Sequence, residues 1–170
     1  EFETGGATYG VYFPTLGLFA WIQGDLDEAE RVLDLALQFA RDNGLTMTES
    51  SAHAFSAMVC WSRGPEQVYE MLGHLERSLA ISTAVDDPVG RGLARLLLGI
   101  GHVAFGQTDT ALVHFDEARS ICIATGNLPN LAHANLFSGQ ALVVSDDPAS
   151  CITGLERLRE GLDIYRAIGD

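Results

Sequence analysis

Apolar residues recur along this chain at the spacing of a helix, and they nowhere alternate with polar residues over the length of a strand. The segment 26–42 is the clearest case, because its apolar positions follow the i, i+3, i+4, i+7 spacing that places side chains on one helix face. Gly, Asn, Asp and Pro punctuate the chain between such segments, as is typical of helix ends. The pattern predicts an all-α chain of eight helices, at about 9–23, 26–42, 46–63, 66–85, 89–105, 108–125, 129–144 and 148–168.

The chain also repeats itself with a long period. Several pairs of identical residues stand 82 positions apart, among them Leu16 and Leu98, Gly17 and Gly99, and Gly24 and Gly106. Small residues mark the second half of each unit at spacings of 42, 40 and 43 residues, and they are Ala36, Ser78, Ala118 and Gly161. Two periods separate the identical pairs, so each unit is slightly longer than 40 residues.

A repeat of this kind predicts a helical solenoid, because a single helix pair cannot bury its apolar face and must stack on the next pair. We expect a right-handed α-solenoid of about four antiparallel helix pairs in one domain, residues 9–170, after a flexible segment at residues 1–8. The pairs are expected at about 9–44, 46–87, 88–127 and 128–170. The chain opens without a methionine, and we expect it to be a fragment of a larger protein.

The small and large residues of the first and third units resemble the signature of the tetratricopeptide repeat. The resemblance is carried by Leu16, Gly17, Gly24, Asp25, Ala29, Leu33 and Ala36, and again by Leu98, Gly99, Gly106, Ala111, Phe115 and Ala118. In such arrays Gly and Ala let the two helices of a unit approach closely, while Leu and Phe fill the space toward the next unit. The second and fourth units depart from the signature, with Ala57 where Gly is usual and an acidic turn in place of the last turn Gly.

The period is longer than the ~34 residues usual for that family. In this respect the chain is similar to the helical arrays of large bacterial LuxR-type ATP-dependent transcription regulators and of multidomain adenylate cyclases. The resemblance implies an array that receives an inducer or a partner and relays the event to a separate output domain.

Composition and charge exclude several classes of function. Of the 170 residues 47% are hydrophobic and the mean hydropathy is +0.14, so the chain can bury a core. Ten basic residues against 23 acidic ones give a net charge of -13, which disfavours direct contact with nucleic acid. Every basic residue is an arginine, so a phosphate-binding loop of the Walker type and a Schiff-base lysine are both excluded.

The potentially reactive residues form no familiar motif. Cys60, Cys122 and Cys151 are odd in number and widely spaced, which signals neither a disulfide framework nor a structural zinc site and fits a reducing cytoplasm. The longest apolar run, 96–105, has about half of the ~20 residues needed to cross a bilayer, so no membrane contact is expected. The five histidines include no H-E-x-x-H and no serine lies in G-x-S-x-G, so we expect no metal, no cofactor and no enzymatic activity.

Acidic residues are absent from the first helix of each expected pair, within 9–23, 52–62, 90–105 and 131–144. First helices line the concave face of a right-handed helical-pair solenoid, so we expect an apolar groove inside and an acidic surface outside. The expected groove residues are Leu18, Trp21, Met58, Trp61, Arg95, Ile100, His102, Val103, Gln140 and Val143.

Two interpretations of this groove stay open. In the first, the groove is filled by an amphipathic helix, an apolar effector or another copy of the array, with Trp21, Met58 and Trp61 as anchors. In the second, superhelical twist and neighbouring segments already cover the groove. Arg95 either meets an acidic ligand group or forms an ion pair with a nearby acidic loop. His102 and His133 either meet as ligands or fill positions of the core or groove.

The end of the array poses a related question, because terminal repeats normally carry a polar cap. No cap is evident here, so Leu158, Leu162 and Tyr165 are expected to form an exposed apolar end face. Symmetric self-association would cover that face. The alternative is that further repeats follow in a larger protein.

The sequence therefore predicts a non-catalytic, cytoplasmic protein-protein interaction module, part of a larger bacterial transcription or signalling regulator. Its partner is expected to be a protein or peptide, such as an apolar helix or a second copy of the chain. The alternative is a sensor of a small molecule or peptide, in which binding changes the superhelical pitch and so signals an attached domain. A dry cavity on which Arg95, His102 and Gln140 converge would favour the sensor.

Overall fold

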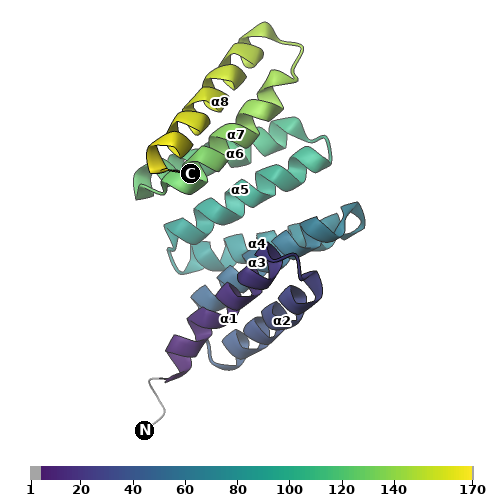
Figure 1. Cartoon of the computed structure of the whole chain (residues 1–170), viewed down its shortest axis with the longest axis vertical. Coiled ribbons are helices and arrows are strands. Elements are labelled where there is room, and N and C mark those ends of the chain that lie inside the picture. Colours follow the sequence, from purple (N-terminus) through teal and green to yellow (C-terminus); the bar gives the residue numbers. More distant parts are fainter. Residues whose placement is uncertain (1–4, 170) are drawn as a thin grey trace. The chain divides into compact units, whose positions relative to one another are not determined.

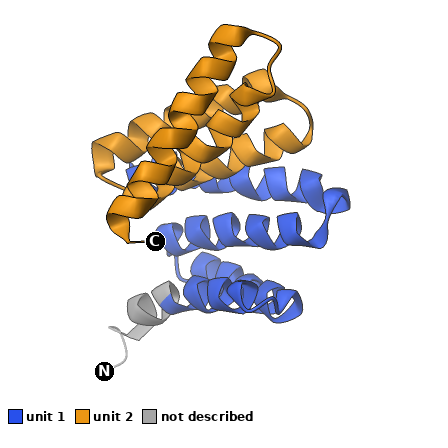
Figure 2. Ribbon diagram, turned by 45° about the horizontal axis from the view of Figure 1, so that its top comes forward, with its two compact units in different colours: residues 1–90 blue, residues 91–170 orange. Residues whose placement is uncertain are grey.

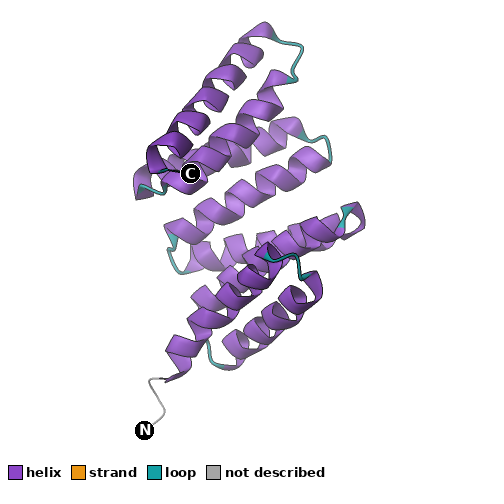
Figure 3. Cartoon of the chain, in the orientation of Figure 1, coloured by secondary structure: helices purple, strands orange, loops and turns teal. Residues whose placement is uncertain are grey.

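A computed structural model describes residues 5–169 of the chain, with side chains from Tyr12 onward. Within those residues the structure is all-helical and contains no strand (Figure 3). The elements are α1 (Gly5–Ile22), α2 (Leu26–Asp42), α3 (Thr46–Arg63), the short 3-10 helix η1 (Pro65–Gln67), α4 (Val68–Ala84), α5 (Pro88–Ala104), α6 (Thr108–Thr125), α7 (Leu128–Val143) and α8 (Pro148–Ile168). The prediction of an all-α chain with eight α-helices is confirmed.

Two of the predicted boundaries are wrong. Helix α1 begins at Gly5 and not near residue 9. The flexibility expected for residues 1–8 stays a prediction, and residues 1–4 lie outside the described part of the chain. The helix expected at 66–85 is split, because Gly64 with a φ of 131° and Pro65 start a separate 3-10 helix before α4 begins at Val68. Proline has no N–H to donate and is well suited to the first position of a helix.

Side chains at the helix ends explain why the remaining boundaries agree closely with the sequence pattern. The Asp25 carboxylate accepts a hydrogen bond of 3.1 Å from the backbone N–H of Glu28 at the start of α2. Asp147 accepts hydrogen bonds from two backbone N–H groups at the start of α8. Gly126 ends α6 in the left-handed conformation, with a φ of 69°, which glycine adopts without steric cost.

The chain divides into two compact units, residues 1–90 and 91–170, with the boundary in the first turn of α5 (Figure 2). The first unit holds the pairs α1–α2 and α3–α4, and the second holds α5–α6 and α7–α8. The two helices of each pair run antiparallel and are joined by a short connection (Figure 1). The single continuous domain expected for residues 9–170 stays a prediction.

Close helix contacts inside each unit depend on glycine. In the first unit a Cβ at Gly17 of α1 would lie 2.5 Å from Cγ of Leu33 on α2, so Leu33 packs directly on the glycine. In the second unit Phe115 of α6 packs in the same way on Gly99 of α5. The same contact therefore recurs at equivalent positions of the first and third repeats, within one helix pair in each case.

Each unit has its own apolar core. The core of the first unit joins α1, α2 and α3, and its buried members are Ala20, Ala29, Leu33, Ala36, Leu37, Ala52 and Val59. In the second unit a buried cluster joins α5, α6 and α7, with Leu96, Ala111, Phe115, Ala118 and Ala134. Helix α2 thus packs on both α1 and α3, and its contact with α3 provides a reference for how one repeat packs on the next.

Candidate functional site

Four of the expected groove residues belong to the first unit. Trp21 is half-buried, packs against the core and donates a hydrogen bond of 2.8 Å from its indole N–H to the hydroxyl of Ser62 on α3. Leu18 and Met58 are also half-buried, whereas Trp61 is exposed. Trp21 therefore contributes to the contact between α1 and α3, and Trp61 is the most accessible of the four.

In the second unit, two of the expected polar groove residues already have partners on the neighbouring helix. The guanidinium of Arg95 lies 2.7 Å from the carboxylate of Glu117 on α6 and 3.0 Å from Nδ1 of His114. The ring of His102 stacks on His114 with 5.1 Å between ring centroids, and its Nδ1 bonds to Gln107. Arg95 thus forms an ion pair, as one interpretation expected, although its partner lies on a helix and not in a loop.

The contacts around His114 also change its basicity. Burial and the positive charge of Arg95 lower the pKa of His114 from its ordinary 6.5 to about 4. A neutral His114 ring accepts the hydrogen bond from Arg95, whereas a protonated ring would repel it. His133 lies elsewhere in the second unit, with its Nδ1 2.9 Å from the carbonyl oxygen of Pro129.

The other expected groove residues of the second unit differ in exposure. Ile100 packs against the buried cluster, Val103 and Gln140 are exposed, and Val143 packs over Gly154 of α8. The ten residues therefore divide into four in one unit and six in the other, and a groove that joins them stays a prediction.

The expected end face on α8 needs a correction. Leu158 points toward α7, because its Cγ would lie 2.8 Å from a Cβ at Gly139, and Tyr165 packs edge-on against His133 with ring centroids 5.5 Å apart. Only Leu162 of the three expected residues is strongly exposed. Two residues that the sequence analysis missed, Ile152 and Leu155, are exposed as well. We call Ile152, Leu155 and Leu162 the α8 face.

A second exposed apolar stripe runs along α1. Tyr12, Leu16 and Phe19 follow helical spacing and have exposed fractions between 53% and 59%; we call these three residues the α1 face. Leu16 and Phe19 also line a hollow of about 370 Å³ between α1 and α2, together with Leu35 of α2. Exposed apolar patches of this kind typically mark interaction sites.

The same positions are buried in later repeats. Forty residues after the α1 face stand Ala52, Ser56 and Val59 of α3, and their exposed fractions lie between 0% and 8%. Leu98, which stands 82 residues after Leu16, is 3% exposed. In the first unit the covering element is visible, because Ala52 and Val59 share the apolar core with residues of α2. The α1 face therefore has the position of a surface on which the second helix of another pair packs.

Leu162 of the α8 face has the complementary position. The markers Ala36 and Gly161 place Leu162 of α8 at the position of Leu37 of α2, 125 residues earlier. Leu37 is 6% exposed and belongs to the core that α2 shares with α3, whereas Leu162 is 48% exposed. The repeat alignment also places Leu158 at the position of the buried Leu33, so this signal was available in the sequence and would have excluded Leu158 from the end face.

Comparisons with known proteins agree with the fold and add nothing about function. No protein-family model and no curated protein matches the chain. The fold is similar to that of BtubC (BKLC) from P. vanneervenii, whose crystal structure aligns with 94% of this chain at a TM-score of 0.73 and 16% sequence identity. The chain spans 64% of the length of that protein. Within residues 5–169, no helix has the length and apolar character that crossing a bilayer requires.

Proposed function

We propose that this chain is a non-catalytic, tetratricopeptide-like interaction module that associates end to end with copies of itself. In this association the α8 face of one copy packs on the α1 face of the next. The observation that carries the proposal is that the α1 face and Leu162 of the α8 face are exposed, although the residues at the equivalent positions of α3 and α2 are buried inside the first unit.

The packing of α2 on α3 serves as the template for the contact between copies. In that template Leu37 of α2 lies in one core with Ala52 and Val59 of α3. Leu162 is equivalent to Leu37, and Tyr12 and Phe19 are equivalent to Ala52 and Val59. The same packing between two copies therefore places Leu162 of one copy against Tyr12 and Phe19 of the next. Burial of large apolar side chains contributes roughly 1.5–3 kcal/mol for each residue, so a few such residues are able to support association.

The composition of the two faces also favours association. At the position of Leu155 on α8, α2 carries Glu30, which is exposed and paired with Arg63. At the position of Ile152, α2 carries Asp27, which is exposed as well. Asp27 and Glu30 stay exposed beside the contact of α2 with α3, so Ile152 and Leu155 add apolar area at the rim of the expected contact, and covering that area is favourable.

An interface between two different faces has a distinct consequence for assembly. Each copy presents one face of each kind, so the contact is heterologous and continues from copy to copy unless it closes into a ring. This differs from the symmetric dimer expected from the sequence, in which the same face of both copies would meet.

The finer identity of the module rests on the sequence resemblance. The equivalent contacts of Leu33 on Gly17 and of Phe115 on Gly99 support an array of tetratricopeptide type. Membership of a larger bacterial regulator and the lack of catalysis stay predictions.

Two single-face variants test the proposal. Leu16→Glu places a charge in the α1 face, and Leu162→Glu places one in the α8 face; both positions are exposed, so the fold should tolerate the change. The matched control is Val113→Glu, because Val113 is an equally exposed apolar residue on α6 outside both faces. Solution mass is measured by light scattering over a hundredfold range of concentration.

We expect the mass of the wild type and of Val113→Glu to rise with concentration, while each single-face variant alone stays monomeric. An equimolar mixture of Leu16→Glu and Leu162→Glu should form a dimer and nothing larger, because the mixture retains one intact face of each kind. A wild type that is monomeric at every concentration would overturn the proposal. A dimer of Leu16→Glu alone would also overturn it, because it would show that like faces meet.

A further inference from the structure

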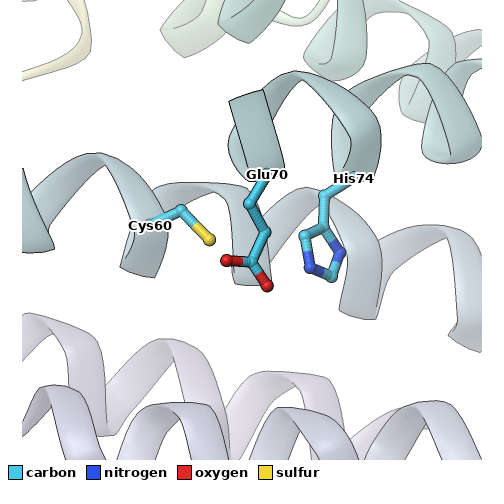
Figure 4. Close-up of side chains that lie close together, drawn as sticks. All are labelled: Cys60, Glu70 and His74. Carbon is cyan, nitrogen blue, oxygen red and sulfur yellow. The ribbon is translucent and has the colours of Figure 1, made fainter. Parts of the chain in front are cut away.

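Three side chains with metal-binding atoms gather between α3 and α4 in the first unit. They are Cys60 of α3 and Glu70 and His74 of α4, and the ligand atoms that they offer all lie within 4.8 Å of one another. Figure 4 shows the thiol, the carboxylate and one ring nitrogen of the imidazole directed to the same side of α4. Thiolate, imidazole and carboxylate are the three ligand types that Zn²⁺ takes in proteins.

Local structure explains why these residues meet. Glu70 and His74 stand one helical turn apart, so their side chains lie on the same face of α4. That face packs against α3, and the turn through Gly64 and η1 brings Cys60 of α3 opposite the first turns of α4. The three ligand atoms are therefore held by two packed helices and not by a loop.

The three side chains border a small hollow that contains an unsatisfied polar group. The hollow has a volume of about 30 Å³, which is the share of volume that one water molecule takes in the liquid. The hydroxyl of Ser56 lines it, and Ser56 is 8% exposed with no hydrogen-bond partner for its Oγ among the described residues. Buried hydroxyl groups normally have a partner, so the Ser56 hydroxyl is available to hydrogen bond to a group bound in the hollow.

The imidazole of His74 is positioned by a second histidine. Nδ1 of His74 lies 2.8 Å from Nδ1 of His53, a residue that is almost fully buried on α3. One of the two nitrogens must carry a hydrogen, and when His74 donates it, Nε2 of His74 keeps a free lone pair for a ligand. Nε2 of His53 in turn lies 3.4 Å from the guanidinium of Arg41 and 3.9 Å from the carboxylate of Glu49. Donation by His74 therefore requires His53 to carry its hydrogen on Nε2 and to turn that atom from Arg41 to Glu49. Ligating histidines commonly donate their other ring N–H to such a partner.

Two further carboxylates border the hollow, those of Glu30 and Asp34 of α2. Glu30 is paired with Arg63. A bound cation would stabilise the thiolate of Cys60.

We propose that Cys60, Glu70 and His74 bind a divalent cation of the Zn²⁺ type. The ligands are Sγ of Cys60, a carboxylate oxygen of Glu70 and Nε2 of His74, and a water that hydrogen bonds to Ser56 completes four-coordination. The thiol releases one proton as the sulfur–metal bond forms, while the imidazole binds in its neutral form. The thiol and imidazole select Zn²⁺ over Mg²⁺ and Ca²⁺, which prefer oxygen ligands.

The geometry requires only a small adjustment. Zinc bonds of about 2.0–2.3 Å in a tetrahedral arrangement place ligand atoms roughly 3.5 Å apart. The present separations of up to 4.8 Å shorten by about 1 Å through side-chain rotation of the three ligands. No metal was expected from the sequence, because Cys60, Glu70 and His74 match neither a cysteine pair nor the H-E-x-x-H motif, and the histidines considered as a ligand pair were His102 and His133.

Cobalt substitution tests the site, because Co²⁺ bound to a thiolate gives an ultraviolet charge-transfer band and tetrahedral Co²⁺ gives visible d–d bands. Co²⁺ is titrated into the full chain, freed of metal by a chelator and kept reduced, and Zn²⁺ is then added in competition. The ligand variants are Cys60→Ser and Glu70→Gln. The matched control is Cys122→Ser, because Cys122 is a buried free cysteine of the second unit.

We expect both sets of bands at one equivalent of Co²⁺ in the wild type and in Cys122→Ser, and their displacement by Zn²⁺. Cys60→Ser should lack the charge-transfer band, and Glu70→Gln should bind at least tenfold more weakly, although Glu70 is exposed and its replacement leaves the core unchanged. The proposal is overturned if the wild type gives no charge-transfer band, if Cys60→Ser retains it, or if Cys122→Ser loses it. Glu70→Gln keeps the test decisive if Cys60→Ser does not fold.

Discussion

Replacing Gly139 by alanine tests the close approach of α7 and α8. A Cβ at this position would lie 2.8 Å from the carbonyl oxygen of Gly154 and 3.0 Å from the backbone nitrogen of Leu158. Both obstacles are backbone atoms of α8, so a side-chain rotation does not relieve the overlap and the helix itself must move. We therefore expect Gly139→Ala to destabilise the protein.

The size of the effect follows from two opposing contributions. Alanine in a helix interior is favoured over glycine by about 0.8–1 kcal/mol, whereas overpacking a close contact costs about 1–3 kcal/mol. Because backbone atoms form the obstacle, the upper end of that range applies and the net loss is about 2 kcal/mol. For a chain of this length the loss corresponds to a fall in Tm of roughly 4–8 °C.

Gly73 provides the matched control, because it also lies inside a helix and a Cβ there would have nothing within 4 Å. Gly73→Ala should therefore raise the stability by up to about 1 kcal/mol. Urea unfolding followed by the helical circular dichroism signal measures both variants against the wild type. A Gly139→Ala protein as stable as the wild type would refute the reasoning about the backbone contact, and a destabilised Gly73→Ala would refute the reasoning about helix propensity.

Three further predictions concern single side chains of the second unit. The pKa of His114 is about 6.5 in the unfolded chain and about 4 in the folded protein, so a fall in pH through this interval favours unfolding. We expect the urea midpoint of His114→Gln to fall less steeply than that of the wild type between pH 7 and pH 4. An equal slope for the two proteins would contradict this. Asp147→Ala removes the cap of α8 and should cost about 1 kcal/mol in the same assay; no loss would show that the cap is dispensable. Phe115→Ala empties a fully buried site and should cost about 3–5 kcal/mol, whereas a loss below 1 kcal/mol would mean that the α5–α6 contact collapses without penalty.

The number, order and approximate ends of the helices could be predicted from the sequence, because they depend on neighbours within a few residues. The stripe of α2 and the caps at Asp25 and Asp147 are local features of this kind. The start of α4 was missed by two residues, since the 3-10 geometry after Gly64 depends on its left-handed backbone conformation.

The candidate surfaces could be predicted only in part, because exposure depends on what covers a residue. Leu16 and Leu98 are the same residue at equivalent positions of two repeats, yet one is 53% exposed and the other 3%. Hydrophobicity and helical spacing are identical for the two residues, so neither property distinguishes them. Leu158 and Leu162 differ for a related reason, since their angular positions on α8 direct one toward α7 and the other away from it.

The sequence by itself determined an all-α chain of repeated helix pairs, the glycines at which the helices approach, and a surface dominated by acidic residues. The helices follow from the 3.6-residue period and from capping chemistry, which act over short stretches of chain. The repeat and its glycines follow from identical residues 82 positions apart, and the acidic surface follows from composition. Only the tertiary structure decided which apolar stripes are left uncovered, and only it brought Cys60 to Glu70 and His74. Those features require segments distant in sequence to pack at a particular distance and rotation, and no local pattern encodes that geometry.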